Sequence, residues 1–165
     1  MISICSNDLQ KLYIAYFGRP GDPSGINYWL SRGNQSLNLR EISKELSIQD
    51  EYTKNVVHDK SLEFKINKLY INLFNRKADF DGLNYWIKMC DSQDYEISDI
   101  AYKLVYSNHK PYSVNLDQQN QDIKILQNKI SAAELFTKKI SSSITLINLY
   151  QPDSLSPWIS GNALI

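Results

Sequence analysis

Hydrophobic residues recur at helical spacing along most of this chain. Two long stripes follow the pattern i, i+3, i+4, i+7, which turns one side of a helix toward a core. They consist of Leu9, Leu12, Tyr13, Tyr16 and Phe17, and of Leu62, Ile66, Leu69, Tyr70, Leu73 and Phe74. Shorter stripes follow at Leu39, Ile42 and Leu46, and at Ile97, Ile100 and Leu104. No stretch alternates as a half-buried strand does, so the pattern predicts an all-α protein.

A stretch of nineteen residues occurs twice. Leu12–Leu30 reads LYIAYFGRPGDPSGINYWL, and Leu69–Ile87, 57 positions later, reads LYINLFNRKADFDGLNYWI, with ten identical positions. Such a repeat indicates one supersecondary unit used twice. We expect duplicated helix-turn-helix units over about residues 6–59 and 61–112, within a single domain over residues 1–165.

The repeated motif predicts the end of one helix and the start of the next. Gly18 and Asn75 follow the first helix of each copy, and these residue types tolerate the left-handed conformation that ends helices. Asp22 and Asp79 stand four residues later and are suited to cap the next helix, with Pro23 in its first turn in copy one.

Three further pairs of residues complete the motif. Gly25 and Gly82 fall at the third helical position, where glycine costs up to about 1 kcal/mol relative to alanine, so we expect a close approach of another helix. Arg19 and Arg76 precede the caps by three residues and should pair with Asp22 and Asp79. The buried faces should be formed by Ile26, Trp29 and Leu30, and by Leu83, Trp86 and Ile87.

The remaining sequence predicts further helices. Asn38 with Glu41 reads as a capping box that opens the third helix of copy one. Beyond Pro111 the repeat stops, and residues 117–140 predict a long helix that spans both copies, with Ile123, Leu126, Ile130, Ala133, Thr137 and Ile140 along one side. Residues 144–150 could form a short helix, and the tail over residues 151–165 is expected to dock through Trp158.

Composition excludes several classes of protein. The chain has 18 basic and 18 acidic residues, whereas a nucleic-acid binder normally has a basic surplus. No apolar run approaches the roughly 20 residues of a membrane span. Cys5 and Cys90 are isolated, so no metal spacing is present and a bridge between them cannot be argued.

No recognisable catalytic or metal-binding pattern occurs. An EF-hand aligned on Gly82 would have Lys77 and Lys88 at its first and last ligand positions, which is incompatible with calcium. His58 and His109 stand apart from any nucleophile or ligand spacing. We therefore expect no catalytic residues, no metal and no cofactor.

One candidate contact surface remains. Tyr28 and Tyr85 precede the two tryptophans and point to another side of the same helices, beside Asn27 and Asn84. These side chains could contact a protein or a sugar, or the tyrosines could be half-buried with a solvated hydroxyl.

The two motif copies resemble the bacterial family called domain of unknown function 4214, whose pattern is a leucine-tyrosine helix, Gly-Arg, Asp-Pro-x-Gly and an aromatic-tryptophan pair. The resemblance covers about residues 6–110, with Asn75 and Phe80 as departures in copy two, and LQNKISAAELFTKKI is similar to the helix that commonly follows. The helical pattern also resembles, distantly, the phycobilisome linker domain. Membership implies a small all-α module of large secreted or surface-layer proteins, without established catalytic residues.

These observations favour a non-catalytic module for protein interaction, assembly or adhesion, with a protein partner or self-association. One alternative is a carbohydrate-binding module, and another is an accessory domain of a hydrolase or transferase, with Asp22 or Asp79 facing Glu41 or Glu45. The resemblance implies an extracellular or cell-surface location. Because the start, MISICSNDLQ, lacks the features of a cleavable export signal, the cytoplasm is the alternative.

Overall fold

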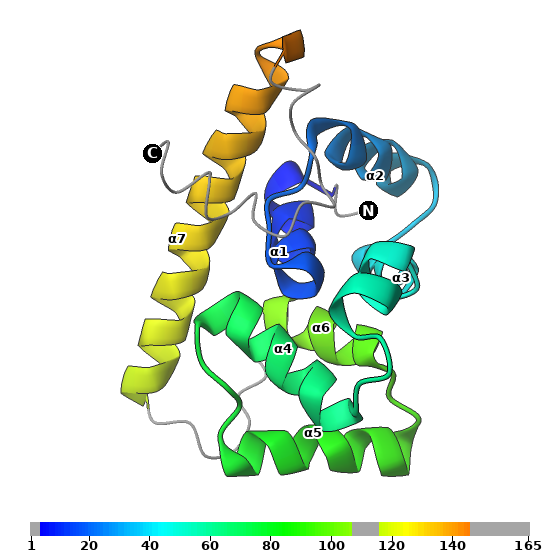
Figure 1. The fold of residues 1–165 in the computed structure, drawn as a ribbon, viewed down its shortest axis with the longest axis vertical. Helices are drawn as coiled ribbons and strands as arrows, with labels where there is room; N and C mark the ends of the chain where they lie inside the picture. The colour runs from blue at the N-terminus through cyan, green and yellow to red at the C-terminus, as the bar shows by residue number, and fades with distance from the viewer. Residues whose placement is uncertain (1–3, 107–115, 146–165) are drawn as a thin grey trace.

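The computed structural model describes residues 4–106 and 116–145. In chain order they form the helices α1 (Ser6–Phe17), α2 (Pro23–Gln35), α3 (Leu39–Ser47), the π-helix η1 (Glu51–Val56), α4 (Leu62–Phe74), α5 (Phe80–Gln93), α6 (Ile97–Tyr106) and α7 (Leu116–Ser141). The predicted all-α fold with a long C-terminal helix is confirmed (Figure 1). The predicted contact of Trp158 lies outside the described residues, as does most of the predicted helix over residues 144–150.

The helices of the two copies correspond in order. α1, α2 and α3 belong to copy one, and α4, α5 and α6 to copy two. The capping box of α3 is confirmed, because the Asn38 N–H donates to the Glu41 carboxylate at 2.7 Å. α6 repeats this arrangement, since the Glu96 N–H donates to Asp99 at 3.0 Å. The third helices of the two copies are thus equivalent as well. The stretch from the start of the second helix to the start of the third is one residue longer in copy two.

Equivalent helices of the two copies pack against each other. α1 contacts α4, and α3 contacts α6. The Asn72 side chain donates to the main-chain oxygen of Ala15, its own equivalent, at 2.9 Å. In the other pair, Lys44 in the last turn of α3 forms an ion pair with Glu96 at the start of α6 at 3.3 Å, so these two helices run in opposite directions. The two copies therefore pack with equivalent helices facing each other, unlike the copies of a stacked repeat, which are related by translation.

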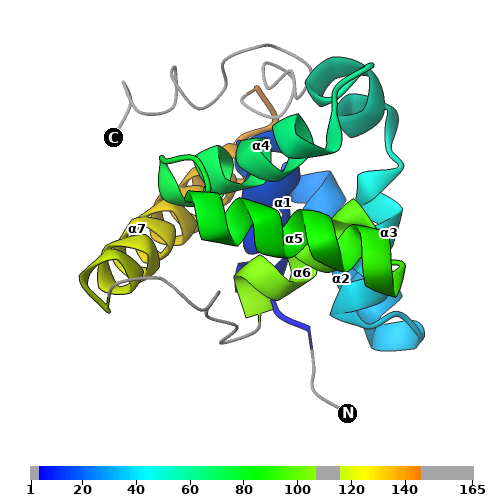
Figure 2. The same ribbon diagram turned by 90° about the horizontal axis from the view of Figure 1, so that it is seen from below.

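α7 spans both copies, as predicted. It packs against α1, α2 and α4 and runs along the side of the molecule in Figure 1. Ile130 and Ala133 are buried at its centre, whereas Ile123 is 54% exposed and does not belong to the packed side that the sequence pattern predicts. Seen from below, α5 lies in front and α7 at one side (Figure 2). The core consists mainly of the apolar faces of α1 and α4, with Leu12 and Leu69 fully buried at equivalent positions.

Candidate functional site

Both motif copies form the predicted turn. Gly18 and Asn75 end α1 and α4 in the left-handed conformation, with φ of 64° and 59°. Asp22 and Asp79 cap α2 and α5, because each carboxylate accepts a hydrogen bond from the backbone N–H three residues later, at 2.8 and 2.7 Å. These motif residues therefore shape the backbone and stabilise helix ends.

The glycines lie where a tyrosine of the preceding helix approaches. A Cβ on Gly25 would lie 2.2 Å from the Tyr13 hydroxyl, whereas a Cβ on Gly82 would lie 3.4 Å from the Tyr70 hydroxyl. The predicted close approach of the preceding helix is thus found at Gly25. At Gly82 the distance to Tyr70 is that of an ordinary van der Waals contact, and the nearest atom is the Asp79 carboxylate oxygen at 3.0 Å. Behind each tyrosine lies a buried tryptophan, Trp29 in copy one and Trp86 in copy two; the latter donates from Nε1 to the Tyr70 hydroxyl at 3.0 Å.

The two motif arginines have different partners. Arg19 donates from Nε and Nη2 to both carboxylate oxygens of Glu51 in η1, each at 2.7 Å, and lies 3.6 Å from Asp22. Arg76 instead binds both oxygens of Asp122 in α7, at 2.9 and 2.6 Å. The predicted pairing of Arg76 with Asp79 is therefore wrong. The reason is geometric: α7 brings a carboxylate to the second turn, as η1 does to the first. Each of these carboxylates accepts two parallel hydrogen bonds from the arginine of its turn.

The hydrogen bonds and charges around Asp22, the helix cap in copy one, favour its ionised form. Burial raises the pKa of Asp22, but hydrogen bonds from Ser24 and Gly25 and the charge of Arg19 outweigh burial, so the pKa lies below its usual value. A carboxyl group with a lowered pKa stabilises the fold above its unfolded-state pKa of 3.8, and that contribution is lost as the pH falls through the lower, folded-state value.

α7 is also fixed to the first turn, by a buried polar network. Gln10 is fully buried and donates to the Thr137 hydroxyl at 2.8 Å, while its oxygen accepts from the Gly21 N–H at 2.9 Å. Thr137 donates in turn to the Gly21 oxygen at 2.6 Å. Since Asp122 reaches the second turn, contacts about 22 Å apart along α7 join it to both copies. The sequence prediction missed this network because glutamine and threonine carry no motif signal.

Copy two repeats only part of that network. Asn67 and Ala78 are the equivalents of Gln10 and Gly21, and the Asn67 oxygen accepts from the Ala78 N–H at 3.1 Å. The shorter asparagine keeps the contact that shapes the turn, whereas only Gln10 extends to α7. The two turns are therefore equivalent in backbone shape and different in their link to α7.

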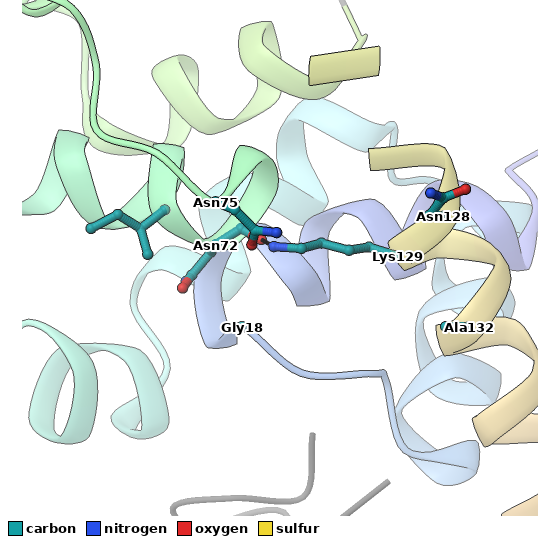
Figure 3. A pocket seen from close by; sticks show the side chains of 7 residues that line it. Gly18, Asn72, Asn75, Asn128, Lys129 and Ala132 are labelled. Atoms are coloured by element: carbon teal, nitrogen blue, oxygen red, sulfur yellow. Dashed lines mark hydrogen bonds between the residues drawn. The ribbon is translucent and has the colours of Figure 1, made fainter. Parts of the chain in front are cut away.

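A pocket of about 500 Å³ lies where α7 passes the ends of α1 and α4. Its lining combines three amides, one amine and small or apolar groups, namely Gly18, Ile71, Asn72, Asn75, Asn128, Lys129 and Ala132. Gly18 and Asn75 are the equivalent end residues of α1 and α4, so the pocket lies where the first helices of the two copies end. In Figure 3, Lys129 extends from α7 to the last turn of α4.

Lys129 is the charged group of this pocket. Its ammonium donates to the main-chain oxygen of Asn72, one of the carbonyls that the end of α4 leaves without a helical partner. Burial lowers the pKa of Lys129 to about 8. Neither Lys129 nor any other pocket residue was selected from the sequence as a ligand-binding group, since Gly18 and Asn75 were assigned to the turn alone.

The structure does not gather the predicted contact residues on one surface. Tyr28 is 54% exposed and Asn27 is exposed beside it on α2, whereas Tyr85 on α5 is half-buried and only its neighbour Asn84 is exposed. α2 and α5 lie at opposite ends of the molecule in Figure 1. The two tyrosine-asparagine pairs are therefore separate, and each tyrosine packs edge-on against its neighbouring tryptophan.

Other chemistry-bearing groups are dispersed in the described part of the chain. His58 is exposed and contacts Asp59, while His109 lies outside the described residues. Cys5 and Cys90 are free thiols. Residues 4–106 and 116–145 contain no group of three His, Cys, Asp or Glu side chains placed to hold a metal ion. Within the same residues no helix has the length and apolar character needed to cross a membrane.

Comparisons with models of protein families, with curated proteins and with solved structures find no match. The resemblance drawn from the repeat motif therefore stays a prediction, and the function has to be argued from the geometry of the chain itself.

The Arg76–Asp122 pair gives a first testable prediction. Both side chains are largely buried, at 21% and 13% exposure, so Asp122→Asn should lower the free energy of unfolding by about 2 kcal/mol because it leaves the guanidinium without its anion. Urea unfolding followed by circular dichroism measures the change. As a control, Asp50→Asn removes an exposed partner of Lys54 and should cost less than about 0.5 kcal/mol. Equal losses in the two variants would contradict the structural role of the Asp122 pair.

Proposed function

We propose that this chain is a non-catalytic interaction module that binds an extended segment of a protein partner in the pocket between α4 and α7. The observation that supports this proposal is the pocket's lining: the described residues there include three asparagines and Ile71, and none of them carries a carboxylate or a thiol. Ligand sites combine a few convergent polar groups with apolar surface in this way. The resemblance of the repeat motif to modules of bacterial surface proteins favours the same class of function.

The amides suit a peptide main chain. Asn75 and Asn128 are exposed, and each offers a carbonyl acceptor and an NH₂ donor, whereas the buried Asn72 amide already donates to Ala15. A main chain in extended conformation presents alternating N–H and C=O groups that match the two exposed amides. Ile71 is 40% exposed at the pocket and offers apolar contact to a side chain of the ligand. An extended segment therefore fits better than a helix, whose main-chain groups are already paired.

A peptide also fits this pocket better than a sugar. Aromatic side chains suit sugar rings because they present flat apolar faces, but none of the described residues that line the pocket is aromatic. The exposed Tyr28 lies on α2 and is not among the pocket residues. The carbohydrate-binding alternative thus needs a different surface from the one that we propose.

The roles of the motif residues favour binding over catalysis. Asp22 and Asp79 accept hydrogen bonds from helix N-termini, and Arg19 and Arg76 form two-point ion pairs. Each group stabilises the scaffold, and a catalytic acid or base needs an accessible site that reaches a substrate. We propose that the two copies are a rigid scaffold and that α7 completes the binding pocket.

A peptide library displayed on phage and selected on the full chain tests this function. Enriched peptides should bind in calorimetry, and Asn75→Gly combined with Asn128→Ala should weaken them at least tenfold, about 1.4 kcal/mol. Asn75→Gly should preserve the turn, because Gly18 has the same conformation in copy one. Asn84→Ala removes an exposed amide of α5 outside the pocket and should leave the affinity unchanged.

Two results would contradict the proposal. One is the absence of any enriched peptide, and the other is equal affinity of the pocket variant and wild type. Binding in a glycan array that Tyr28→Ala abolishes would favour the carbohydrate alternative instead. Self-association through the pocket would appear in light scattering as a dimer that the double variant dissociates.

A further inference from the structure

Lys129 is a half-buried amine in an open pocket whose described residues supply no counter-ion. Of the described residues that line the pocket, Lys129 alone carries a charge. Its hydrogen bond goes to a main-chain oxygen, that of Asn72, rather than to a carboxylate. The side chain therefore lies against the negative end of the α4 dipole, which stabilises a positive charge at this position.

We infer that Lys129 is a covalent binding site for small aldehydes that carry hydroxyl groups. The lysine nitrogen attacks the carbonyl carbon, a C–N bond forms, and the carbonyl oxygen leaves as water. The balance is R–NH₃⁺ + R′–CHO → R–NH⁺=CHR′ + H₂O, so no oxidant or reductant is needed. The product keeps one positive charge and one N–H, which can still donate to the Asn72 oxygen.

Charge retention favours an aldehyde over an acyl donor. Acylation would convert the ammonium to a neutral amide and remove the charge from the end of α4, whereas an iminium preserves it. The hydroxyl group of the ligand fits the end of α4 that Lys129 reaches, because the Asn75 amide there both donates and accepts hydrogen bonds. This inference does not depend on the peptide ligand proposed above.

Burial also supplies the free amine that this reaction needs. The other described groups that line the pocket around Lys129 are uncharged. Burial outweighs the opposing effect of the α4 dipole and lowers the pKa of the amine to about 8. At pH 7.5 about a quarter of such an amine is unprotonated, compared with about 0.1% of an ordinary lysine. The difference makes Lys129 more reactive than lysines of the exposed surface.

Reductive labelling of the full chain tests the inference. Glycolaldehyde forms the iminium with the lysine, and sodium cyanoborohydride reduces the iminium to a stable secondary amine. Peptide mass spectrometry then locates the modified lysine. Lys129 should be labelled at least about tenfold faster than Lys124 and Lys138, which are exposed on the same helix, and its rate should rise through about pH 8. Labelling of Lys129 at the rate of Lys124 and Lys138 would overturn the inference.

Variants separate pocket recognition from simple reactivity. Asn75→Gly with Asn128→Ala should slow labelling by glycolaldehyde several-fold but leave labelling by acetaldehyde, which has no hydroxyl group, unchanged. An equal effect on both aldehydes would exclude recognition of the hydroxyl group. Lys129→Arg should abolish the fast-labelled site and preserve the charge. Because peptide affinity is measured without aldehyde, failure of either proposal is visible independently of the other.

Discussion

Trp86→Ala is expected to lower the free energy of unfolding by about 4 kcal/mol. The Trp86 side chain is fully buried, and its indole N–H donates to the Tyr70 hydroxyl at 3.0 Å. The substitution removes the largest apolar surface at the junction of α4 and α5 and leaves a cavity beneath it. Urea unfolding followed by far-ultraviolet circular dichroism measures the loss, because its signal reports helix content and does not depend on the removed indole.

Trp86→Phe separates the effect of lost side-chain volume from the effect of the lost hydrogen bond. It keeps most of the ring but leaves the buried Tyr70 hydroxyl without its donor, so the expected loss is about 1–2 kcal/mol. Trp29→Ala is the matched variant in copy one, where Trp29 is 4% exposed, and it should cost a similar amount to Trp86→Ala. A loss below about 1 kcal/mol in Trp86→Ala would contradict its place in the core.

Local sequence signals predicted the parts of the fold that depend on neighbouring residues. The helix ends at Gly18 and Asn75, the caps at Asp22 and Asp79 and the capping box at Asn38 each depend on contacts within a few positions. Periodicity likewise predicted the long helix α7, because an amphipathic pattern is a property of one segment. These features were confirmed with boundaries close to those expected.

Contacts between distant segments could not be predicted. The choice of Asp122 rather than Asp79 by Arg76 depends on where α7 lies, which no local pattern encodes. The π-helix η1 gave no sequence signal, yet its Glu51 binds Arg19. The pocket is formed by the ends of two helices and the side of a third, so its lining residues become neighbours only in the folded chain.

The contact of α7 with both copies gives these differences a common origin. A single helix that crosses two equivalent halves cannot make the same contacts with both. α7 therefore binds the second turn through Asp122 and the first through Thr137, and the sequence of each copy differs where α7 reaches it: Gln10 in one corresponds to Asn67 in the other. A duplicated motif thus forms a scaffold to which α7 adds a pocket.

The second large effect is an asymmetry between equivalent glycines. Gly25→Ala should destabilise the protein by about 2–3 kcal/mol, because the new Cβ would lie 2.2 Å from the hydroxyl of a buried tyrosine, Tyr13, that cannot move without disturbing the core. At Gly82 the corresponding distance to Tyr70 is 3.4 Å, and the higher helix propensity of alanine offsets part of the strain. Gly82→Ala should therefore change stability by less than about 1 kcal/mol.

A double variant identifies the cause of the asymmetry. Tyr13→Phe removes the hydroxyl that the new methyl group would meet, so Gly25→Ala should cost less in that background than in wild type, by at least about 1 kcal/mol in a double-mutant cycle. Urea unfolding of the single and double variants gives the coupling energy. Equal costs for Gly25→Ala in both backgrounds, or equal costs at Gly25 and Gly82, would mean that the tyrosine hydroxyl is not what requires glycine. A coupling energy between Gly25→Ala and Tyr13→Phe, together with a small stability change in Gly82→Ala, would support tighter packing of the motif in copy one than in copy two.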